Sequence, residues 1–140
     1  MNPRQITRRR ALAAIGGGIL ASPAFRAFSA DGGRKFKIGA CDWSIQKRGD
    51  PAALKTAKEI GLDGVEVSFG QPGEKFDLRL AENREKYLAE AKSHGVEIAS
   101  LAMGILNQVP YASDAGAEQW VADCIGVMPK LNQKVVLLAF

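Results

Sequence analysis

The stretch GLDGVEVSF (residues 61–69) decides the fold class of this chain, because it joins a helix end to a short apolar strand. The strand itself is VEVSF (residues 65–69). Three more short apolar runs have the same character: FKIGAC (36–41), VEIASL (96–101) and VVLLAF (135–140). Helix-patterned segments separate the runs, which recur about every 30 to 40 residues, the length of a strand–helix–strand unit. The pattern predicts an α/β fold with a parallel sheet.

The helices between these strands are marked by start and stop signals. Asp50 is a good N-cap, Gly95 is a typical helix stop, and Pro129 should end or kink the last helix. The expected helices run over residues 50–61, 82–94 and from Ser113 or Asp114 to 129. Their expected buried faces are Leu54, Ala57 and Ile60; Tyr87, Leu88 and Ala91; and Trp120, Val121, Cys124, Ile125 and Met128.

Residues 1–30 carry the features of an export signal and a linker. TRRRAL (7–12) places paired arginines before an apolar stretch over residues 11–25. As a helix this stretch would span roughly 22 Å, short of the ~30 Å hydrocarbon core, so a membrane anchor is the weaker interpretation. The segment resembles the twin-arginine (Tat) leader, with Ala11 where Phe is usual. We expect cleavage after Ala24, or alternatively after Ser29, and an exported, periplasmic bacterial protein with no membrane attachment after cleavage.

The positive charge of the chain belongs to this leader. The sequence has 19 Lys and Arg residues against 15 Asp and Glu residues, and five of the arginines precede residue 31. The remaining 14 basic and 15 acidic residues give a net charge of −1. A nucleic-acid partner is therefore not expected.

The two cysteines, Cys41 and Cys124, are expected to be free. Export would permit a disulfide. However, Cys41 ends a strand, whereas Cys124 lies on the core face of a helix. Two buried thiols are the favoured interpretation.

The last apolar run indicates that four strands are not a complete fold. A parallel barrel filled by side chains needs about eight strands. An apolar parallel edge without a neighbour is an association hazard. We therefore expect that more chain belongs after Phe140, and that residues 31–140 alone aggregate or dimerise through residues 135–140.

Four motifs in this order resemble the sugar phosphate isomerase/epimerase family. They are KIGACDWS (37–44), GLDGVEV (61–67), HGVEI (94–98) and KVVLLAF (134–140). That family belongs to the xylose-isomerase-like TIM barrels. The resemblance implies that residues 31–140 are the N-terminal half, about four βα units, of a (β/α)8 TIM barrel.

The same resemblance implies a sugar (phosphate) isomerase or epimerase whose substrate is a small carbohydrate. Family members commonly use a divalent metal, held by side chains on the later strands, to assist proton transfer next to a sugar carbonyl. None of those ligand positions lies in this chain, so no metal ligand is assigned and the fragment itself is expected to be inactive. The alternative is a non-catalytic periplasmic sugar-binding or interaction module with the same fold. Neither the particular sugar nor the oligomeric state is indicated.

A nucleotide-binding domain and an apurinic endonuclease are both disfavoured by the sequence. The first strand leads into Cys-Asp-Trp-Ser instead of a glycine-rich phosphate loop. The net charge of −1 after the leader and the lack of histidines after the second and third strands argue against the endonuclease branch.

Alternation along the second strand supplies the first candidate site residues. Val65, Val67 and Phe69 share one side, which should face the helices, so Glu66 and Ser68 should face the barrel lumen. Glu66 is a candidate acceptor for sugar hydroxyls or a neighbour of the metal. The alternative is a structural glutamate held by a lysine or by backbone amides.

The ends of the first and third strands supply two more candidates. Trp43 should point inward and is suited to stack on a sugar, although a buried core tryptophan is equally compatible. Asn107 follows the third strand and is placed to reach a ligand from an upper loop. The parity of Asp42 argues against a lumen role and favours an exposed loop position or a hydrogen bond on the helix side. Catalytic residues are not identified.

Overall fold

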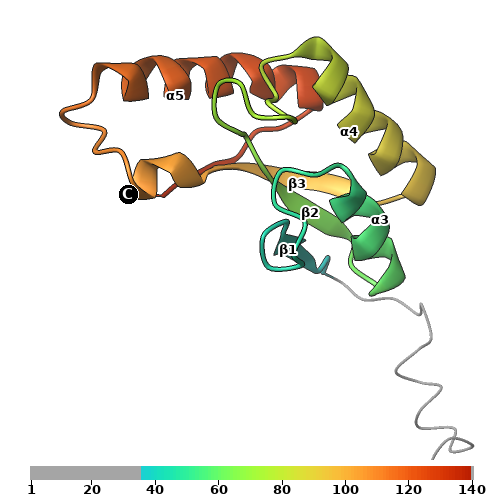
Figure 1. The fold of residues 1–140 in the computed structure, drawn as a ribbon. Helices are drawn as coiled ribbons and strands as arrows, with labels where there is room; N and C mark the ends of the chain where they lie inside the picture. Colours follow the sequence, from blue (N-terminus) through green and yellow to red (C-terminus); the bar gives the residue numbers. More distant parts are fainter. Residues whose placement is uncertain (1–35, 140) are drawn as a thin grey trace, which may run out of the picture. The chain divides into compact units, whose positions relative to one another are not determined.

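Four strands form one open parallel sheet, in the order β1-β2-β3-β4. In this computed structural model of the protein the described residues are 36–139, so the expected leader, its cleavage sites and the export route lie outside them. Strands and helices alternate along the chain as predicted (Figure 1). Their bounds are β1 (Gly39–Cys41), α3 (Ala52–Glu59), β2 (Gly64–Ser68), α4 (Ala81–His94), β3 (Glu97–Met103), η1 (Gly104–Asn107), α5 (Ala115–Val127), η2 (Met128–Leu131) and β4 (Val136–Leu138). The predicted α/β fold with a parallel sheet is confirmed; the sheet is not closed, and the arrangement is consistent with half of a (β/α)8 barrel.

The register of the sheet places three polar side chains, Cys41, Glu66 and Ser100, next to one another on neighbouring strands. Cys41 of β1 lies opposite Glu66 of β2. Between β2 and β3 the register shifts after Val65, so that Glu66 is opposite Ser100. The extra residue on β3 is a bulge, and it brings Ser100 next to the Glu66 carboxylate.

The hydrophobic core lies between one face of the sheet and the helices. In β2 the apolar side chains Val65 and Val67 alternate with Glu66 and Ser68, and the apolar set meets the helices. The buried members of the core include Val65, Val67, Leu101 and Met103 from the strands, Phe69 directly after β2, and Leu54, Tyr87 and Cys124 from the helices. We call this helix-covered side the outer face and the opposite side, which carries Glu66, the inner face.

Helix bounds agree with the predictions at most ends. Helix α4 covers residues 81–94 and stops at Gly95, which adopts the left-handed conformation at φ 62°. Helix α5 starts after Asp114, whose Oδ1 accepts a hydrogen bond from the Gly116 amide at 2.8 Å. After α5 the chain tightens into the 3-10 helix η2, which contains Pro129, as expected.

Two expected core residues are solvent-exposed, and the predicted buried faces of their helices are corrected accordingly. Ile60 is 58% exposed because α3 ends at Glu59, so its side chain leaves the buried stripe. Ile125 is 56% exposed. It follows buried Cys124 by one residue, a rotation of about 100° around the helix, and therefore lies outside the buried face.

The outer strands are shorter than their apolar runs. Strand β1 takes only the last three residues of the first run, and β4 only the middle of the fourth. Val135 is 60% exposed beside the edge strand. Cys41 and Cys124 are free, as predicted, although Cys41 is only partly buried. No helix within residues 36–139 combines the length and apolar character needed to cross a membrane.

Candidate functional site

The inner face of the sheet carries a carboxylate between two neutral donors. Glu66 projects from the middle of β2, and its Oε2 accepts a hydrogen bond from Ser100 Oγ at 2.7 Å. The Cys41 thiol donates to Glu66 Oε1 at 3.2 Å. Glu66 faces inward as predicted, but thiol and hydroxyl groups hold it instead of the lysine or amides considered as alternatives. Among the described residues no cation lies within ion-pair distance of this carboxylate.

The carboxylate also acts on its neighbour. Burial, followed by the hydrogen bond to Glu66 and the negative charge of Glu66, raises the pKa of the Cys41 thiol to about 11. The thiol therefore stays protonated near neutral pH and serves as a hydrogen-bond donor. This leaves Glu66 with acceptor capacity for one or two further donors from a ligand.

Directly above this layer, Asp42 ties β1 to the end of β2. Its side chain is fully buried. Oδ1 accepts from Ser68 Oγ at 2.8 Å, while Oδ2 accepts from the Ser68 amide at 2.8 Å and from the Gly49 amide at 2.9 Å. The expectation of an exposed loop position for Asp42 is wrong. Asp42 does accept hydrogen bonds, but from Ser68 at the end of β2 and from the loop amide of Gly49, and not from a helix as expected. Asp42 fixes the shape of the loop over residues 42–51, which forms part of the site.

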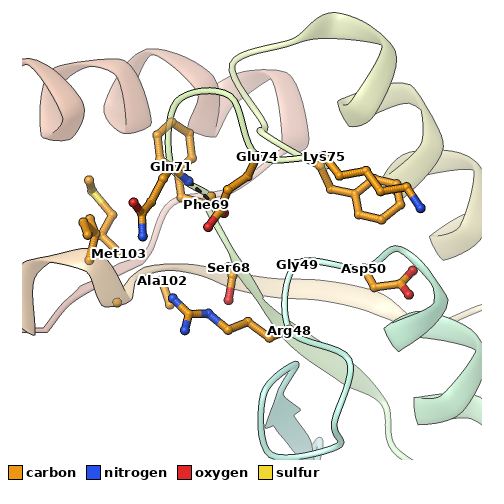
Figure 2. Close-up of a pocket in the computed structure, with 14 residues that line it drawn as sticks. Arg48, Gly49, Asp50, Ser68, Phe69, Gln71, Glu74, Lys75, Ala102 and Met103 are labelled. Atoms are coloured by element: carbon orange, nitrogen blue, oxygen red, sulfur yellow. Dashed lines mark hydrogen bonds between the residues drawn. The ribbon is translucent and has the colours of Figure 1, made fainter.

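A cavity of about 510 Å³ opens over the ends of β2 and β3 (Figure 2). Figure 2 shows Ser68 on its floor, with Arg48 on one side and Glu74 and Gln71 on the other. Other residues in its wall include Gly49, Asp50, Phe69, Lys75, Phe76, Met103 and Ile105. The size lies within the range of small-molecule sites, about 300 to 1,000 Å³.

The loop after β2, which forms one wall of this cavity, is held by the partly buried Arg79. Arg79 donates to Asp77 Oδ1 at 2.9 Å, to Asp123 Oδ2 at 3.0 Å and to the Gly70 carbonyl at 3.2 Å. Its guanidinium also lies 4.4 Å from the centre of the Phe69 ring. Together with the hydrogen bond from Gln119, the hydrogen bond from Arg79 lowers the pKa of the Asp123 carboxyl. These contacts join the loop after β2 to α5 and give the cavity a fixed side.

A second cavity of about 320 Å³ adjoins the first and gathers three of the four predicted site residues. Trp43, Ser68 and Asn107 come from the ends of β1 and β2 and from η1. Trp43 is 40% exposed, so it is a wall of the cavity and not a core residue. Glu66 does not line either cavity; it lies two residues before Ser68 on the same face of β2.

Arg48 lines both cavities and was not singled out from the sequence. It follows β1 in the loop before α3. A Cβ placed on Gly104 would lie 3.9 Å from Arg48 Nη2, so the guanidinium reaches across to the end of β3. The signal in the sequence was a basic residue in the loop after a parallel strand, the end of the sheet where ligands bind.

Glu97 and His94 do not line either of these two cavities. Glu97 begins β3 and forms an exposed ion pair with Lys37. His94 Nε2 lies 3.1 Å from Glu90 Oε2 in the last turn of α4. Within residues 36–139 no group of three or more His, Cys, Asp or Glu side chains is arranged to hold a metal ion. The residues described thus do not form a metal centre, and we derive no chemical step through a metal.

Comparison with known proteins gives one informative similarity. No protein-family model matches the chain. The chain is 28% identical over 83 residues to 2-epi-5-epi-valiolone 7-phosphate 2-epimerase of Actinoplanes sp., a match that covers 59% of this chain and 30% of that protein. The matched region therefore spans less than a third of the length of the relative.

Proposed function

We propose that this chain is the N-terminal half-barrel of a sugar (phosphate) isomerase or epimerase. The observation that carries the proposal is the gathering of Trp43, Ser68 and Asn107 around a cavity at the carboxyl ends of the strands. This is the end at which TIM barrels place their active sites. The similarity to an enzyme whose name describes a 2-epimerase acting on a 7-phosphate compound supports the same class.

In the complete protein these residues would bind and orient the substrate. The Trp43 ring offers an apolar face for the C–H side of a sugar, and Asn107 offers amide groups for its hydroxyls. Glu66, below the cavities, can accept hydroxyl donors because its lone pairs are only partly used by Cys41 and Ser100. The reaction would move a proton on the carbon next to the carbonyl.

The remaining chemistry would come from sequence beyond Phe140. We propose that the second half of the barrel supplies the acid and base and the ligands of a divalent metal, which would polarise the substrate oxygens when bound. The half-barrel alone would be inactive. We further propose that the protein is exported by the Tat route with cleavage after Ala24 or Ser29; mass spectrometry of the exported form should show an N-terminus between Phe25 and Asp31.

Solvent exchange tests the reaction class directly. The complete protein should incorporate deuterium from D₂O at the carbon next to the carbonyl of a ketose phosphate, followed by proton NMR. Glu66→Gln should lower kcat/KM more than tenfold, about 1.4 kcal/mol, with a nearly unchanged melting temperature. Glu97→Gln is the matched control, because it makes the same change at the other end of the strands.

Three outcomes separate the alternatives. If the complete protein binds a sugar but no substrate exchanges its proton, the non-catalytic sugar-binding module replaces the enzyme. If neither binding nor exchange is found, the proposal is wrong. If exchange survives Glu66→Gln while the melting temperature falls by several degrees, Glu66 is a structural residue.

A further inference from the structure

Arg48 is a solvent-exposed cation that lines both cavities, and among the described residues it has no hydrogen-bond or ion-pair partner for its side chain. Within residues 36–139 its guanidinium takes part in none of the side-chain hydrogen bonds or ion pairs, whereas Arg79 and Arg84 each bond to several groups. Figure 2 shows the Arg48 side chain running beside Ser68 toward Ala102. An arginine directed into a cavity without a partner has all five donors available to a ligand.

The other charged groups around the larger cavity are already engaged. Glu74 Oε2 accepts from the Gln71 amide at 2.9 Å, and Asp50 Oδ1 accepts from the Ala52 amide at 2.9 Å. Lys75 Nζ lies over the Phe76 ring, 4.8 Å from its centre. These two carboxylates therefore stabilise their own loops, and neither is within ion-pair distance of Arg48.

The charge around the smaller cavity is positive. Among the described residues that line it, Arg48 is the only charged one; the others are Trp43, Ser68, Ala102, Gly104, Asn107, Gln108, Leu137 and Ala139. The small residues Ala102 and Gly104 leave space beside the guanidinium. A wall of one arginine, one tryptophan and two amides fits a ligand with an anionic end and a hydroxylated body.

We propose that Arg48 binds the phosphate group of a phosphorylated sugar or polyol, with the carbohydrate body against Trp43 and Asn107. The planar guanidinium donates two parallel N–H bonds to phosphate oxygens, a geometry that a lysine does not reproduce. The assignment rests on the proposed carbohydrate site and makes Arg48 the residue that selects phosphorylated over free sugars.

Binding of inorganic phosphate to the complete protein tests this assignment without any turnover. Titration followed by calorimetry and ³¹P NMR should show saturable binding that Arg48→Gln weakens tenfold or more. The phosphate affinity of Arg48→Lys should lie between those of the parent protein and Arg48→Gln, because lysine keeps the charge and loses the paired donors. Lys47→Gln removes the same charge from the neighbouring position, outside both cavities, and should change affinity less than twofold. Within residues 36–139 the Arg48 side chain makes no hydrogen bond or ion pair, so the variants should melt at the temperature of the parent protein.

Several results would overturn the assignment. These are phosphate binding that is absent or not saturable, equal losses in Arg48→Gln and Lys47→Gln, or a loss in Lys75→Gln but not in Arg48→Gln. Acetate that competes as well as phosphate would make the ligand a carboxylate and would also refute it. Arg48-dependent phosphate binding without solvent exchange would refute the proposed reaction alone, and solvent exchange that is insensitive to Arg48→Gln would refute the subsite alone.

Discussion

The two faces of the sheet differ in how their side chains are stabilised. On the outer face Val65, Val67 and Leu101 are fully buried against the helices, and packing makes the fold. On the inner face Cys41, Glu66 and Ser100 bond to one another and remain partly accessible. The comparison teaches that the inner polar groups are satisfied in pairs from strand to strand. Arg48 differs from these groups, because its side chain has no hydrogen-bond or ion-pair partner within residues 36–139, and for this reason we propose it as a ligand contact.

The largest expected effect concerns Asp42, which joins the strand ends to the loop above them. Asp42→Ala would leave the amides of Gly49 and Ser68 and the Ser68 hydroxyl without their acceptor in a buried place. We expect the free energy of unfolding to fall by about 3 kcal/mol or more, measured by urea denaturation. Asp42→Asn, which keeps one oxygen, should lose less. A loss below about 1 kcal/mol for the alanine variant would show that the loop holds without this carboxylate.

The next effect concerns the reactivity of Cys41 on the inner face. With the pKa of its thiol raised to about 11, labelling by iodoacetamide at pH 8 should be about 100-fold slower than in the urea-unfolded chain. Glu66→Gln removes the neighbouring negative charge, which lowers the pKa of the thiol and shifts the labelling profile to lower pH. The thiol is still buried in this variant, so the labelling rate of Cys41 should rise only part of the way to that of the unfolded chain.

Peptide mass spectrometry separates Cys41 from Cys124 in this experiment. Burial likewise raises the pKa of the Cys124 thiol to about 11, but Glu66 plays no part there. Its labelling should not respond to Glu66→Gln. Fast labelling of Cys41 in the parent protein would mean that the Cys41–Glu66 hydrogen bond does not form in solution.

A smaller effect concerns association through the edge of the sheet. In residues 31–140, Val135 is exposed beside β4, and we expect self-association in size-exclusion chromatography. Val135→Lys should shift this association to about tenfold higher protein concentration, if the valine contributes about 1.5 kcal/mol. Ile125→Lys, an exposed apolar residue on α5, is the control and should leave association unchanged. A monodisperse parent domain would show that this edge is tolerated in water.

The periodicity of the sequence predicts the strands and their faces well. Alternation in residues 65–69 placed Glu66 and Ser68 correctly, because side-chain direction within a strand follows from backbone geometry alone. Alternation did not place Asp42, because the chain has already left β1 and turns over residues 42–46. Parity has no meaning once the backbone turns.

The proposed role of Arg48 does not follow from the sequence alone, for a different reason. Its importance lies in the lack of a partner, and that depends on where Asp50, Glu74 and Lys75 find theirs. These contacts depend on the backbone conformation of the loops that carry the three residues, and residue spacing does not specify that conformation. Residue type and position place a basic residue in the loop after β1, but they do not distinguish Arg48 from its neighbour Lys47.

The smallest expected effect is an increase in the free energy of unfolding, and it concerns a residue on the outer face. Tyr87 of α4 is fully buried, and within the described part of the chain its hydroxyl has no hydrogen-bond partner. Burial, together with the negative charges of Asp42 and Asp50, raises the pKa of the Tyr87 phenol far above its usual range, so the group stays neutral. An unpaired hydroxyl in an apolar core costs free energy that phenylalanine does not, and the two rings have nearly the same volume. Tyr87→Phe should therefore raise the free energy of unfolding by about 1 kcal/mol in urea denaturation.

Ser68→Ala is the matched control, since it removes a buried hydroxyl that is bonded to Asp42, and it should lower the free energy of unfolding by about 1 kcal/mol. If both variants lose stability, the Tyr87 hydroxyl is bonded in solution, and the outer face contains a polar interaction like those of the inner face.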